Sequence, residues 1–413
     1  MGVPAMIDRR KFLKAGSGAA LGLAGVSTAL RESRSQTSEK RSARDPRIRR
    51  YARLGRTELQ VSDISLGSSS TSDPDVIAHA FDRGVNFFDS AESYRWGNAE
   101  EAIGKALKGR RDKVILTSKT KAGADDSRGE IMQSLEGSLR RLQTDHVDIY
   151  FNHSVNDVDR LRNQEWLEFT ELAKRQGKIR FRGVSGHGRN LAESIDFAID
   201  NDIADVILVA YNFSQDPDFY DQLRHTFHWS AIQPELPRFL KKAKQKDIGV
   251  LAMKTLMGAK LNDMRPFERD GSTFSQAAFR WVLSDPNVDA LLVSMSDIDR
   301  IDEYVAASGS TGLSEYDREL LERYATLQAG QYCQPGCNAC ANACPQNVEI
   351  AEVLRTRMYA VDYGDRELAR KDYAALGEGA AACISCTTQA CLGSCPIGVP
   401  IARFTRDAAL NLV

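Results

Sequence analysis

Some residue types and patterns are absent from large parts of the sequence. No cysteine occurs in the first 332 of the 413 residues, which excludes a disulfide framework or a thiolate metal site from most of the chain. No stretch reaches the roughly 18 unbroken apolar residues of a membrane-spanning helix. The formal net charge is only −1, which gives no support for a nucleic-acid-binding protein. With 42% hydrophobic residues the chain can bury a core, and its length indicates two or three domains.

Positive charge is concentrated at the N-terminus, where residues 1–50 contain 12 Lys and Arg against 4 Asp and Glu. The segment Asp-Arg-Arg-Lys-Phe-Leu-Lys at residues 8–14 resembles a twin-arginine export signal. A weakly apolar stretch follows and ends near small residues suited to cleavage, which is the order of parts in a signal peptide. A signal peptide is therefore expected over residues 1–30 and a polar linker over residues 31–50. A basic, disordered N-terminus is the alternative.

The predicted export signal implies where the protein is located and that it binds a cofactor. The twin-arginine machinery would place the protein in the periplasm, or at the membrane if the signal is not cleaved. Twin-arginine export is associated with proteins that fold and take up their cofactor before crossing. The signal therefore predicts a prosthetic group further along the chain.

From residue 51 onward, short apolar runs alternate with amphipathic segments. Continuous apolar runs are typical of parallel strands that are buried on both faces. Eight strand–helix units in about 260 residues fit a closed (β/α)8 barrel, whereas an open doubly wound sheet usually has Gly-x-Gly-x-x-Gly after its first strand. That turn reads Leu-Gly-Ser-Ser-Ser at residues 66–70, so an α/β fold with a barrel over residues 51–325 is predicted. The predicted strands are residues 64–66, 85–88, 114–117, 147–150, 181–184, 206–209, 250–253 and 290–293.

Polar side chains follow three consecutive predicted strands. Asp89 ends the second apolar run, Lys119 the third and His153 the fourth, and Tyr94 lies five residues after Asp89. Each residue alone has an ordinary structural role available to it, such as a helix cap or a packed ring. Catalytic groups of barrel enzymes lie at the carboxyl ends of the strands. Together these four residues therefore predict a catalytic site at that end of the barrel.

The segments around these residues resemble the aldo-keto reductase family. Residues 88–94 look like its Asp…Tyr segment, and residues 98–104 look like the helix that follows. Ser-Lys at residues 118–119 and Asn-His at residues 152–153 match its lysine and histidine positions, within a resemblance that spans residues 51–308. The resemblance implies a carbonyl reductase or alcohol dehydrogenase that acts on a small molecule with NADP(H) or NAD(H).

The resemblance also implies a role for each of the four residues. Tyr94 would be the general acid that protonates the carbonyl oxygen as a hydride attacks the carbon. Lys119 would lower the pKa of Tyr94 from its usual value of about 10, because a neighbouring ammonium favours the phenolate. Asp89 would hold Lys119 charged and in place. His153 would donate a hydrogen bond to the carbonyl oxygen and orient it.

The segments that correspond to the family's cofactor site depart from its pattern. In the family, a Ser-Asn pair and a glutamine hold the nicotinamide amide. The corresponding positions of this sequence are Ser185, Gly186 and Leu208. After the eighth strand, Arg300 fits the family's arginine, but Ser294 stands at its lysine position. Ser185, Ser294 and Arg300 are the predicted cofactor-binding residues. The choice between NADP and NAD stays open, as does a weakened nicotinamide site.

All eight cysteines lie in two runs near the C-terminus. Each run ends in Cys-x3-Cys-Pro, and this Cys-Pro ending is the ferredoxin signature. Two [4Fe–4S] clusters are therefore predicted in a small, mostly helical, ferredoxin-like domain over residues 326–413; zinc and disulfides are the alternatives. In two-cluster ferredoxins the fourth cysteine of each run ligates the other cluster. The expected ligand sets are therefore Cys333, Cys337, Cys340 and Cys395 for one cluster, and Cys383, Cys386, Cys391 and Cys344 for the other.

These patterns predict an exported oxidoreductase with a hydride-transferring barrel and two iron–sulfur clusters. Hydride transfer moves two electrons at once, whereas a [4Fe–4S] cluster moves one. The clusters would therefore serve an electron-transfer partner protein or a structural role. The alternative function is an iron–sulfur electron-transfer or binding protein whose barrel no longer performs nicotinamide-dependent chemistry.

Overall fold

The computed structural model describes residues 45–412, with gaps at residues 188–189, 217–234, 257–263, 270–271, 311, 329–332, 334–336, 338 and 362–364. The chain divides into residues 1–44 and residues 45–413. The predicted signal peptide and most of the predicted linker lie outside the described residues, so export and location stay predictions. A search of the described helices finds none with the length and apolar character to span a membrane.

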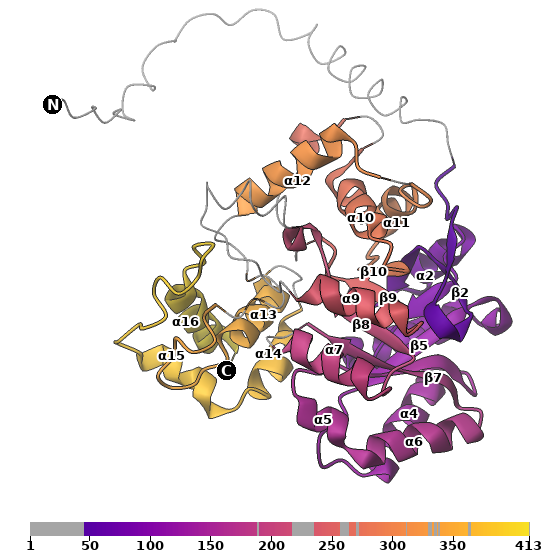
Figure 1. Ribbon diagram of the computed structural model, residues 1–413, viewed down its shortest axis with the longest axis horizontal. Coiled ribbons are helices and arrows are strands. Elements are labelled where there is room, and N and C mark those ends of the chain that lie inside the picture. The colour runs from indigo at the N-terminus through magenta and orange to yellow at the C-terminus, as the bar shows by residue number, and fades with distance from the viewer. Residues whose placement is uncertain are drawn as a thin grey trace, which may run out of the picture. The chain divides into compact units, whose positions relative to one another are not determined.

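Eight parallel strands close into a barrel, as predicted (Figure 1). Each strand pairs with its neighbours in sequence, and the last strand pairs with the first, with Ser294 opposite Gly67. Every predicted apolar run coincides wholly or in part with a strand. The barrel strands are β3 (Ile64–Gly67), β4 (Phe87–Asp89), β5 (Ile115–Thr120), β6 (Val147–Asn152), β7 (Ile179–Gly186), β8 (Val206–Ala210), β9 (Gly249–Met253) and β10 (Ala290–Ser294).

Amphipathic helices connect the strands and bury one face each against the barrel. In α4, for example, Ile131, Leu135, Leu139 and Leu142 are buried, and Ser127 caps the helix through a reciprocal capping box with Glu130. The helices of this layer are α2 (Pro74–Asp82), α3 (Asn98–Ala106), α4 (Arg128–Leu142), α5 (Val158–Arg162), α6 (Gln164–Arg175), α7 (Leu191–Asp200), α9 (Leu236–Gln245), α10 (Phe274–Ser284), α11 (Ile298–Val305) and α12 (Glu315–Gln328).

A short antiparallel hairpin plugs the amino end of the barrel. It consists of β1 (Tyr51–Arg53) and β2 (Gln60–Ser62). Leu54 at its turn is fully buried in the inner core of the barrel, and the backbone N–H of Arg56 donates to the Asp247 carbonyl (2.5 Å) just before β9 begins. The plug leaves the carboxyl end as the place for a binding site.

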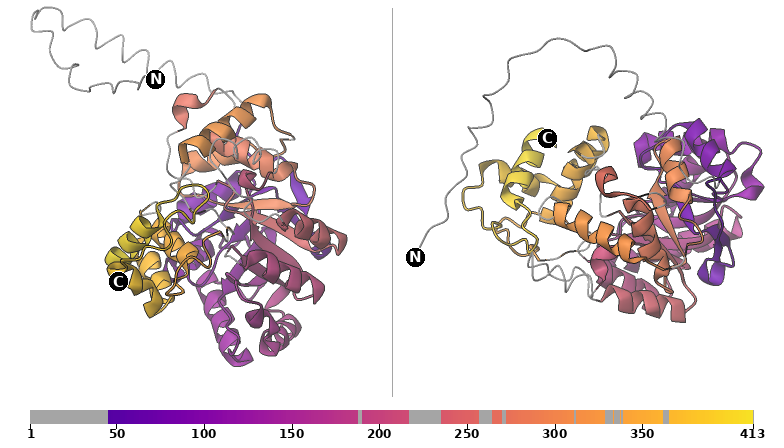
Figure 2. Two further views of the ribbon diagram at one scale, coloured as in Figure 1. Left: turned by 60° about the vertical axis from the view of Figure 1, so that its left-hand side comes forward. Right: turned by 90° about the horizontal axis from the view of Figure 1, so that it is seen from above.

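A group of helices follows the barrel, as predicted, and lies against its carboxyl end. The members are α13 (Ile350–Val361), α14 (Arg366–Ala374), α15 (Ala382–Ser385) and α16 (Ile401–Leu412). They form one cluster in Figures 1 and 2, and α13 packs against both α14 and α16. An ion pair between Lys121, just after β5, and Asp372 of α14 (3.2 Å) joins this cluster to the barrel. Short 3-10 helices occur at Gly55–Thr57, Tyr94–Gly97, Arg111–Lys113, Phe213–Gln215, Arg265–Phe267 and Glu378–Ala381.

Close packing inside the barrel gives a first prediction. Gly183 of β7 lies directly against the ring of Phe151 in the neighbouring strand β6, and a Cβ at Gly183 would overlap that ring. Phe151 is fully buried in the inner core of the barrel, so other core side chains surround its ring. Gly183→Ala is therefore expected to lower the free energy of unfolding by about 1–3 kcal/mol, which urea denaturation would measure.

Gly129→Ala is the matched control. Gly129 lies in the exposed first turn of α4, where only the Ser127 hydroxyl comes near the added Cβ, at 3.9 Å. That substitution is expected to leave stability unchanged or to raise it by about 0.4–1 kcal/mol. Equal stability of the two variants would contradict the close packing of β6 and β7.

Candidate active site

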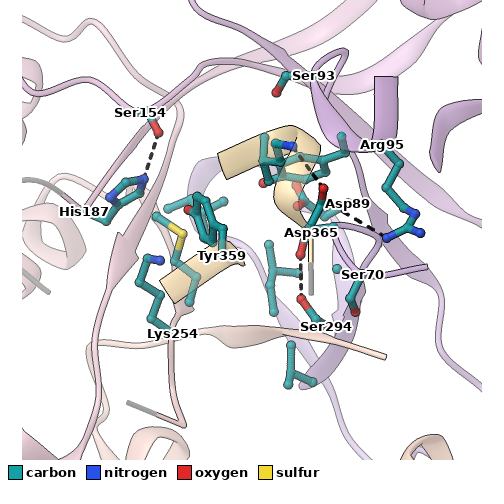
Figure 3. Close-up of a pocket in the computed structure, with 18 of the residues that line it drawn as sticks. Ser70, Asp89, Ser93, Arg95, Ser154, His187, Lys254, Ser294, Tyr359 and Asp365 are labelled. Carbon is teal, nitrogen blue, oxygen red and sulfur yellow. Dashed lines mark hydrogen bonds and ion pairs between the residues drawn. The ribbon is translucent and has the colours of Figure 1, made fainter. Parts of the chain in front are cut away.

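A pocket opens at the carboxyl end of the barrel (Figure 3). Residues at or just after all eight strands line one part of it, and residues of α13, the α13–α14 connection and α14 line the rest. Of the predicted site residues, the pocket brings together Asp89, Tyr94, His153, Ser294 and Arg300.

A buried ion pair lies at the base of the site. The Lys119 ammonium donates to Asp89 Oδ2 (2.6 Å) and to the Ser90 carbonyl (2.6 Å), and both charged side chains are almost fully buried. The other oxygen of Asp89 accepts from the Thr117 hydroxyl (2.7 Å). Asp89 and Thr117 face each other in the parallel register of β4 and β5. The structure therefore holds Lys119 in place through Asp89, as expected.

The relation between Lys119 and Tyr94 differs from the expectation. The ammonium lies over the face of the Tyr94 ring, 4.9 Å from its centroid, and the described contacts of the two residues include no hydrogen bond between Nζ and the phenol. Burial, and then the negative charge of Asp89, raises the pKa of Tyr94 well above its usual value. The prediction that Lys119 lowers this pKa is wrong, because the ammonium is neutralised by Asp89 and is displaced from the hydroxyl.

His153 lies edge-on to Tyr94, with ring centroids 5.6 Å apart and an interplanar angle of 83°. Burial lowers the pKa of His153 well below its usual value, and the nearby cations Lys119 and Lys121 lower it further. The imidazole is therefore neutral at pH 7 and has one N–H to donate. Its Nδ1 is buried and has no hydrogen-bond partner in the described part of the chain, so a bound ligand is able to supply one.

The turn that carries Tyr94 has a strained backbone. Arg95 and Trp96 both adopt the left-handed region, with φ values of 47° and 60°, which non-glycine residues rarely do. Helix α14 and the residue that caps it contact this turn from outside the barrel. Asp365 lies 3.9 Å from the Arg95 guanidinium, and the Lys371 ammonium lies 4.6 Å from the centre of the Trp96 ring. The C-terminal helices therefore help to hold the position of Tyr94.

The predicted cofactor residues fall into two groups. Ser294 lines the pocket, and its hydroxyl oxygen lies 2.7 Å from the hydroxyl oxygen of Ser69. Arg300 also lines the pocket, near the start of α11, and its guanidinium donates to the Tyr304 hydroxyl (3.2 Å). Ser185, by contrast, is buried, is not among the pocket-lining residues, and accepts from the backbone N–H of Ser154 (3.1 Å). Its role as a cofactor residue stays a prediction.

Gly186 shows why this chain lacks the second member of the Ser-Asn pair. A Cβ at this position would lie 2.9 Å from the Val155 carbonyl oxygen and 2.9 Å from Leu191 Cδ1. The backbone oxygen is unable to move aside, so an asparagine does not fit here without a shift of the chain.

The pocket also contains residues that the sequence analysis did not predict. Arg355 and Tyr359 of α13 and Lys254 after β9 line it, and so does His187, whose Nε2 lies 2.8 Å from the Ser154 hydroxyl. Burial raises the pKa of Tyr359, but the charges of Lys254 and Arg355 outweigh it and lower the pKa overall. Arg355 and Tyr359 are four residues apart on an ordinary amphipathic helix, a pattern that contains no signal linking them to the barrel.

The structure describes all eight cysteines, and no disulfide joins any two of them. Burial, and then the neighbouring Cys337, Cys340 and Cys395, raise the pKa of the Cys333 thiol, so these four side chains lie near one another. The pKa of Cys391 is likewise raised by burial and by Cys344, Cys383 and Cys386, and these four residues line one small cavity. The assignment of the cysteines to two crossed ligand sets stays a prediction.

The cysteine sets do not form a site for a single ion. Over the described ranges, no group of three or more His, Cys, Asp or Glu side chains is arranged to hold one metal ion. A zinc site needs its thiolates to meet at one point. The four ligands of a [4Fe–4S] cluster bind four different irons, and the two clusters stay a prediction.

Two histidines of the pocket predict a pH dependence of stability. Burial lowers the pKa values of both His153 and His187 well below 6.5 in the folded protein. The unfolded chain binds protons at these positions below about pH 6.5, while the folded protein does not, so stability falls as the pH drops below that value. Between pH 7.5 and pH 5.5, measured by urea denaturation, the slope is expected to rise from near zero toward about 1.4 kcal/mol per pH unit for each histidine.

Replacing both residues, in the variant His153→Gln/His187→Gln, should flatten this slope. The control is His146→Gln at the surface, next to Asp145 and outside the pocket, which should keep the slope of the natural chain. An unchanged slope in the double variant would show that the two imidazoles are protonated in the folded protein.

Comparison with known proteins places the barrel in a family. The model of the aldo/keto reductase family matches residues 63–325. The chain is 26% identical over 306 residues to the L-galactose dehydrogenase of Arabidopsis thaliana, covering 65% of this chain and 91% of that protein.

One solved structure supports the same placement, and a second one shares the fold. An aldo-keto reductase from Klebsiella pneumoniae in complex with NADPH has 26% identity and a TM-score of 0.50, covering 68% of this chain and 95% of that one. The aldo-keto reductase AKR11C1 from Bacillus halodurans in its holo form has 22% identity and a TM-score of 0.52, covering 67% and 96%, and shares the fold. The family match contains all eight barrel strands and ends before the first cysteine. The chain therefore belongs to the aldo/keto reductase family.

Proposed function

We propose that this protein is an NADP(H)-dependent oxidoreductase that reduces the carbonyl group of a small molecule, or oxidises the corresponding alcohol, with Tyr94 as the proton donor. The observation that supports this most directly is the juxtaposition of Tyr94, the neutral His153 and the buried Asp89–Lys119 pair at the carboxyl end of the barrel. The NADPH complex of the Klebsiella pneumoniae relative supports the choice of cofactor.

The chain's own residues would handle the proton and the oxygen. When bound, the nicotinamide supplies the hydride. Because its pKa is raised, Tyr94 keeps its proton until negative charge develops on the carbonyl oxygen, and then donates it there. His153 donates its N–H to the same oxygen and orients it. The Lys119 ammonium, held by Asp89 over the Tyr94 ring, keeps that ring in position through a cation–π contact.

The segment after β10 would hold the adenosine phosphate of NADP(H). Arg300 is the third residue of α11, so a phosphate at this helix N-terminus would meet both the helix dipole and a guanidinium. Ser294 and Ser69 add two hydroxyls on the same side of the pocket. Two charges are unfavourable for a phosphate here: Asp297, which caps the helix through the backbone N–H of Arg300 (2.9 Å), and Asp299 in the first turn.

We infer that the C-terminal helices hold two [4Fe–4S] clusters. One would be held by Cys333, Cys337, Cys340 and Cys395, the other by Cys383, Cys386, Cys391 and Cys344. The clusters would exchange single electrons with a partner protein, or stabilise the helices. The twin-arginine motif supports export of the folded, cluster-loaded protein to the periplasm.

Tyr94→Phe tests the proposed reaction. The variant is expected to lower kcat for NADPH-dependent carbonyl reduction at least about 100-fold, because it removes the proton donor. The dissociation constant for NADPH, from fluorescence titration of anaerobically purified protein, should stay within about 3-fold of that of the natural chain, because the phenol hydroxyl is not needed to hold the cofactor.

Tyr51→Phe is the control, since Tyr51 is exposed in the amino-end hairpin and its hydroxyl donates only to the Gly84 carbonyl (2.7 Å). It should retain full activity. If Tyr94→Phe also retained activity, Tyr94 would not be the acid. If the natural chain failed to bind NADPH or NADH at all, the protein would instead be an iron–sulfur protein with an inactive barrel.

Iron and sulfide analysis tests the clusters. Anaerobically purified protein is expected to contain about eight irons and about eight sulfides per chain, with the visible absorption of [4Fe–4S] clusters. Cys395→Ser should halve the iron content by removing the cluster of the first cysteine run, as Cys333→Ser does. Zinc in place of iron, or an unchanged iron content in Cys395→Ser, would contradict the assignment.

A further inference from the structure

One face of the C-terminal helices exposes large apolar side chains. Leu392, in the segment between α15 and α16, is 61% exposed, and Leu410 of α16 is 62% exposed. Both leucines line the same hollow in the surface, together with Pro400. The active-site pocket contains no residue of α15 or α16, and Figure 1 shows these two helices on the side of the C-terminal helices that is farther from the barrel. A contiguous apolar surface that stays exposed is typical of an interaction site.

This hollow adjoins the small cavity that four of the cysteines line. The four are Cys344, Cys383, Cys386 and Cys391. The hollow and the cavity have three lining residues in common, which are Gln389, Ala402 and Arg406. A protein seated in the hollow would therefore be separated from these cysteines by a single layer of side chains. Electrons pass between proteins only over short distances, so this is a suitable place for electron transfer to the cysteine site.

Arginines surround the apolar part of the hollow. Arg357 pairs with Asp407 (2.7 Å), which is the one carboxylate that lines the hollow among the described residues. Arg406 is directed toward the cysteines, because its guanidinium donates to the Cys386 carbonyl (2.7 Å). Arg403 is exposed and pairs with no carboxylate in the part of the chain that the structure describes. The hollow therefore has an excess of positive charge, and Arg403 is available to a group from outside.

This charge indicates which kind of partner fits. A second copy of the chain that docked through the same face about a two-fold axis would bring its own arginines against these arginines, which is unfavourable. Residues 1–50 carry an excess of Lys and Arg and are repelled for the same reason. A partner with surface carboxylates is attracted instead, because the carboxylates complement Arg403.

We propose that the hollow around Leu392, Leu410 and Arg403 is the docking surface for a small acidic protein that carries single electrons. Carboxylates of the partner pair with Arg403, and its apolar side chains pack on the two leucines. One electron then passes between the partner and the centre held by the adjacent cysteines, so that one is oxidised as the other is reduced and no bond is made or broken. Electron transfer here rests on the [4Fe–4S] clusters of the proposed function, while binding is a property of the surface itself.

Binding of a plant-type [2Fe–2S] ferredoxin, an acidic one-electron carrier, tests the docking surface. Isothermal titration calorimetry with the anaerobically purified full-length protein is expected to give a dissociation constant of about 1–100 μM, because interfaces between electron-transfer proteins are small. An increase from about 20 mM to about 200 mM NaCl should weaken binding about 5-fold or more. Arg403→Glu should weaken it about 10-fold or more, and Leu392→Ser about 3- to 10-fold.

Arg175→Glu is the matched control. Arg175 is exposed at the end of α6 in the barrel, and this variant has the same change in net charge as Arg403→Glu. It should bind the ferredoxin within about 2-fold of the natural chain, because rim charges act locally at this ionic strength. No binding by the natural chain, equal binding by Arg403→Glu, or an equal loss in Arg175→Glu would overturn the proposal.

Two further measurements test other occupants of the surface. Analytical ultracentrifugation should show the same oligomeric state for the natural chain and for Arg403→Glu. Vesicles of phosphatidylserine should bind both proteins equally in a sedimentation assay. A dimer that Arg403→Glu dissociates would assign the hollow to a second copy of the chain, and vesicle binding that Arg403→Glu abolishes would assign it to a membrane. Either result would overturn the acidic partner.

Electron transfer separates the docking surface from the clusters. When reduced and oxidised partners are mixed in a stopped-flow instrument, Arg403→Glu should slow electron transfer between the ferredoxin and the protein about 10-fold or more, while reduction of the protein by dithionite stays within about 2-fold of the natural rate. Arg403-dependent binding of ferredoxin by protein that contains no iron would refute the clusters and leave the docking surface standing. A full iron content without ferredoxin binding would refute the docking surface and leave the clusters standing.

Discussion

The buried ion pair between Lys119 and Asp89 is the interaction on which the rest of the site depends. Two charges removed from water are costly unless hydrogen bonds satisfy them. Here the Ser90 carbonyl and the Thr117 hydroxyl complete the pair, and both partners lie on or directly after β4 and β5. The parallel register of two neighbouring strands thus brings a fixed, neutralised pair of charges beneath Tyr94.

A second constraint comes from the open end of the barrel. The hairpin plugs the amino end, and residues from all eight strands or the turns after them line one pocket at the other end. Helices α13 and α14 then become part of its wall and supply Arg355, Tyr359 and Asp372. The segment that carries the cysteines is therefore also part of the pocket that we propose for carbonyl reduction.

Much of the fold was predictable from local patterns. Buried parallel strands must be apolar on both faces, so each strand was visible as a continuous run, and the stripe of Ile131, Leu135, Leu139 and Leu142 marked the buried face of α4. The positions of Asp89, Tyr94 and Lys119 followed because strand ends converge in a closed barrel. The electrostatic effect of Lys119 on Tyr94 did not follow, because it depends on where the ammonium points.

The amino-acid order is enough to determine the strand–helix alternation, the positions of the four predicted catalytic residues at the strand ends, and the cysteine spacing. All of these depend on residues that are close together in the chain. Other features exist only in the folded molecule. The raised pKa of Tyr94, the lack of room at Gly186, and the meeting of Lys254 with Tyr359 arise from groups on distant segments. Burial and charge act through space, and their strength depends on distances of a few ångströms that local sequence patterns do not specify.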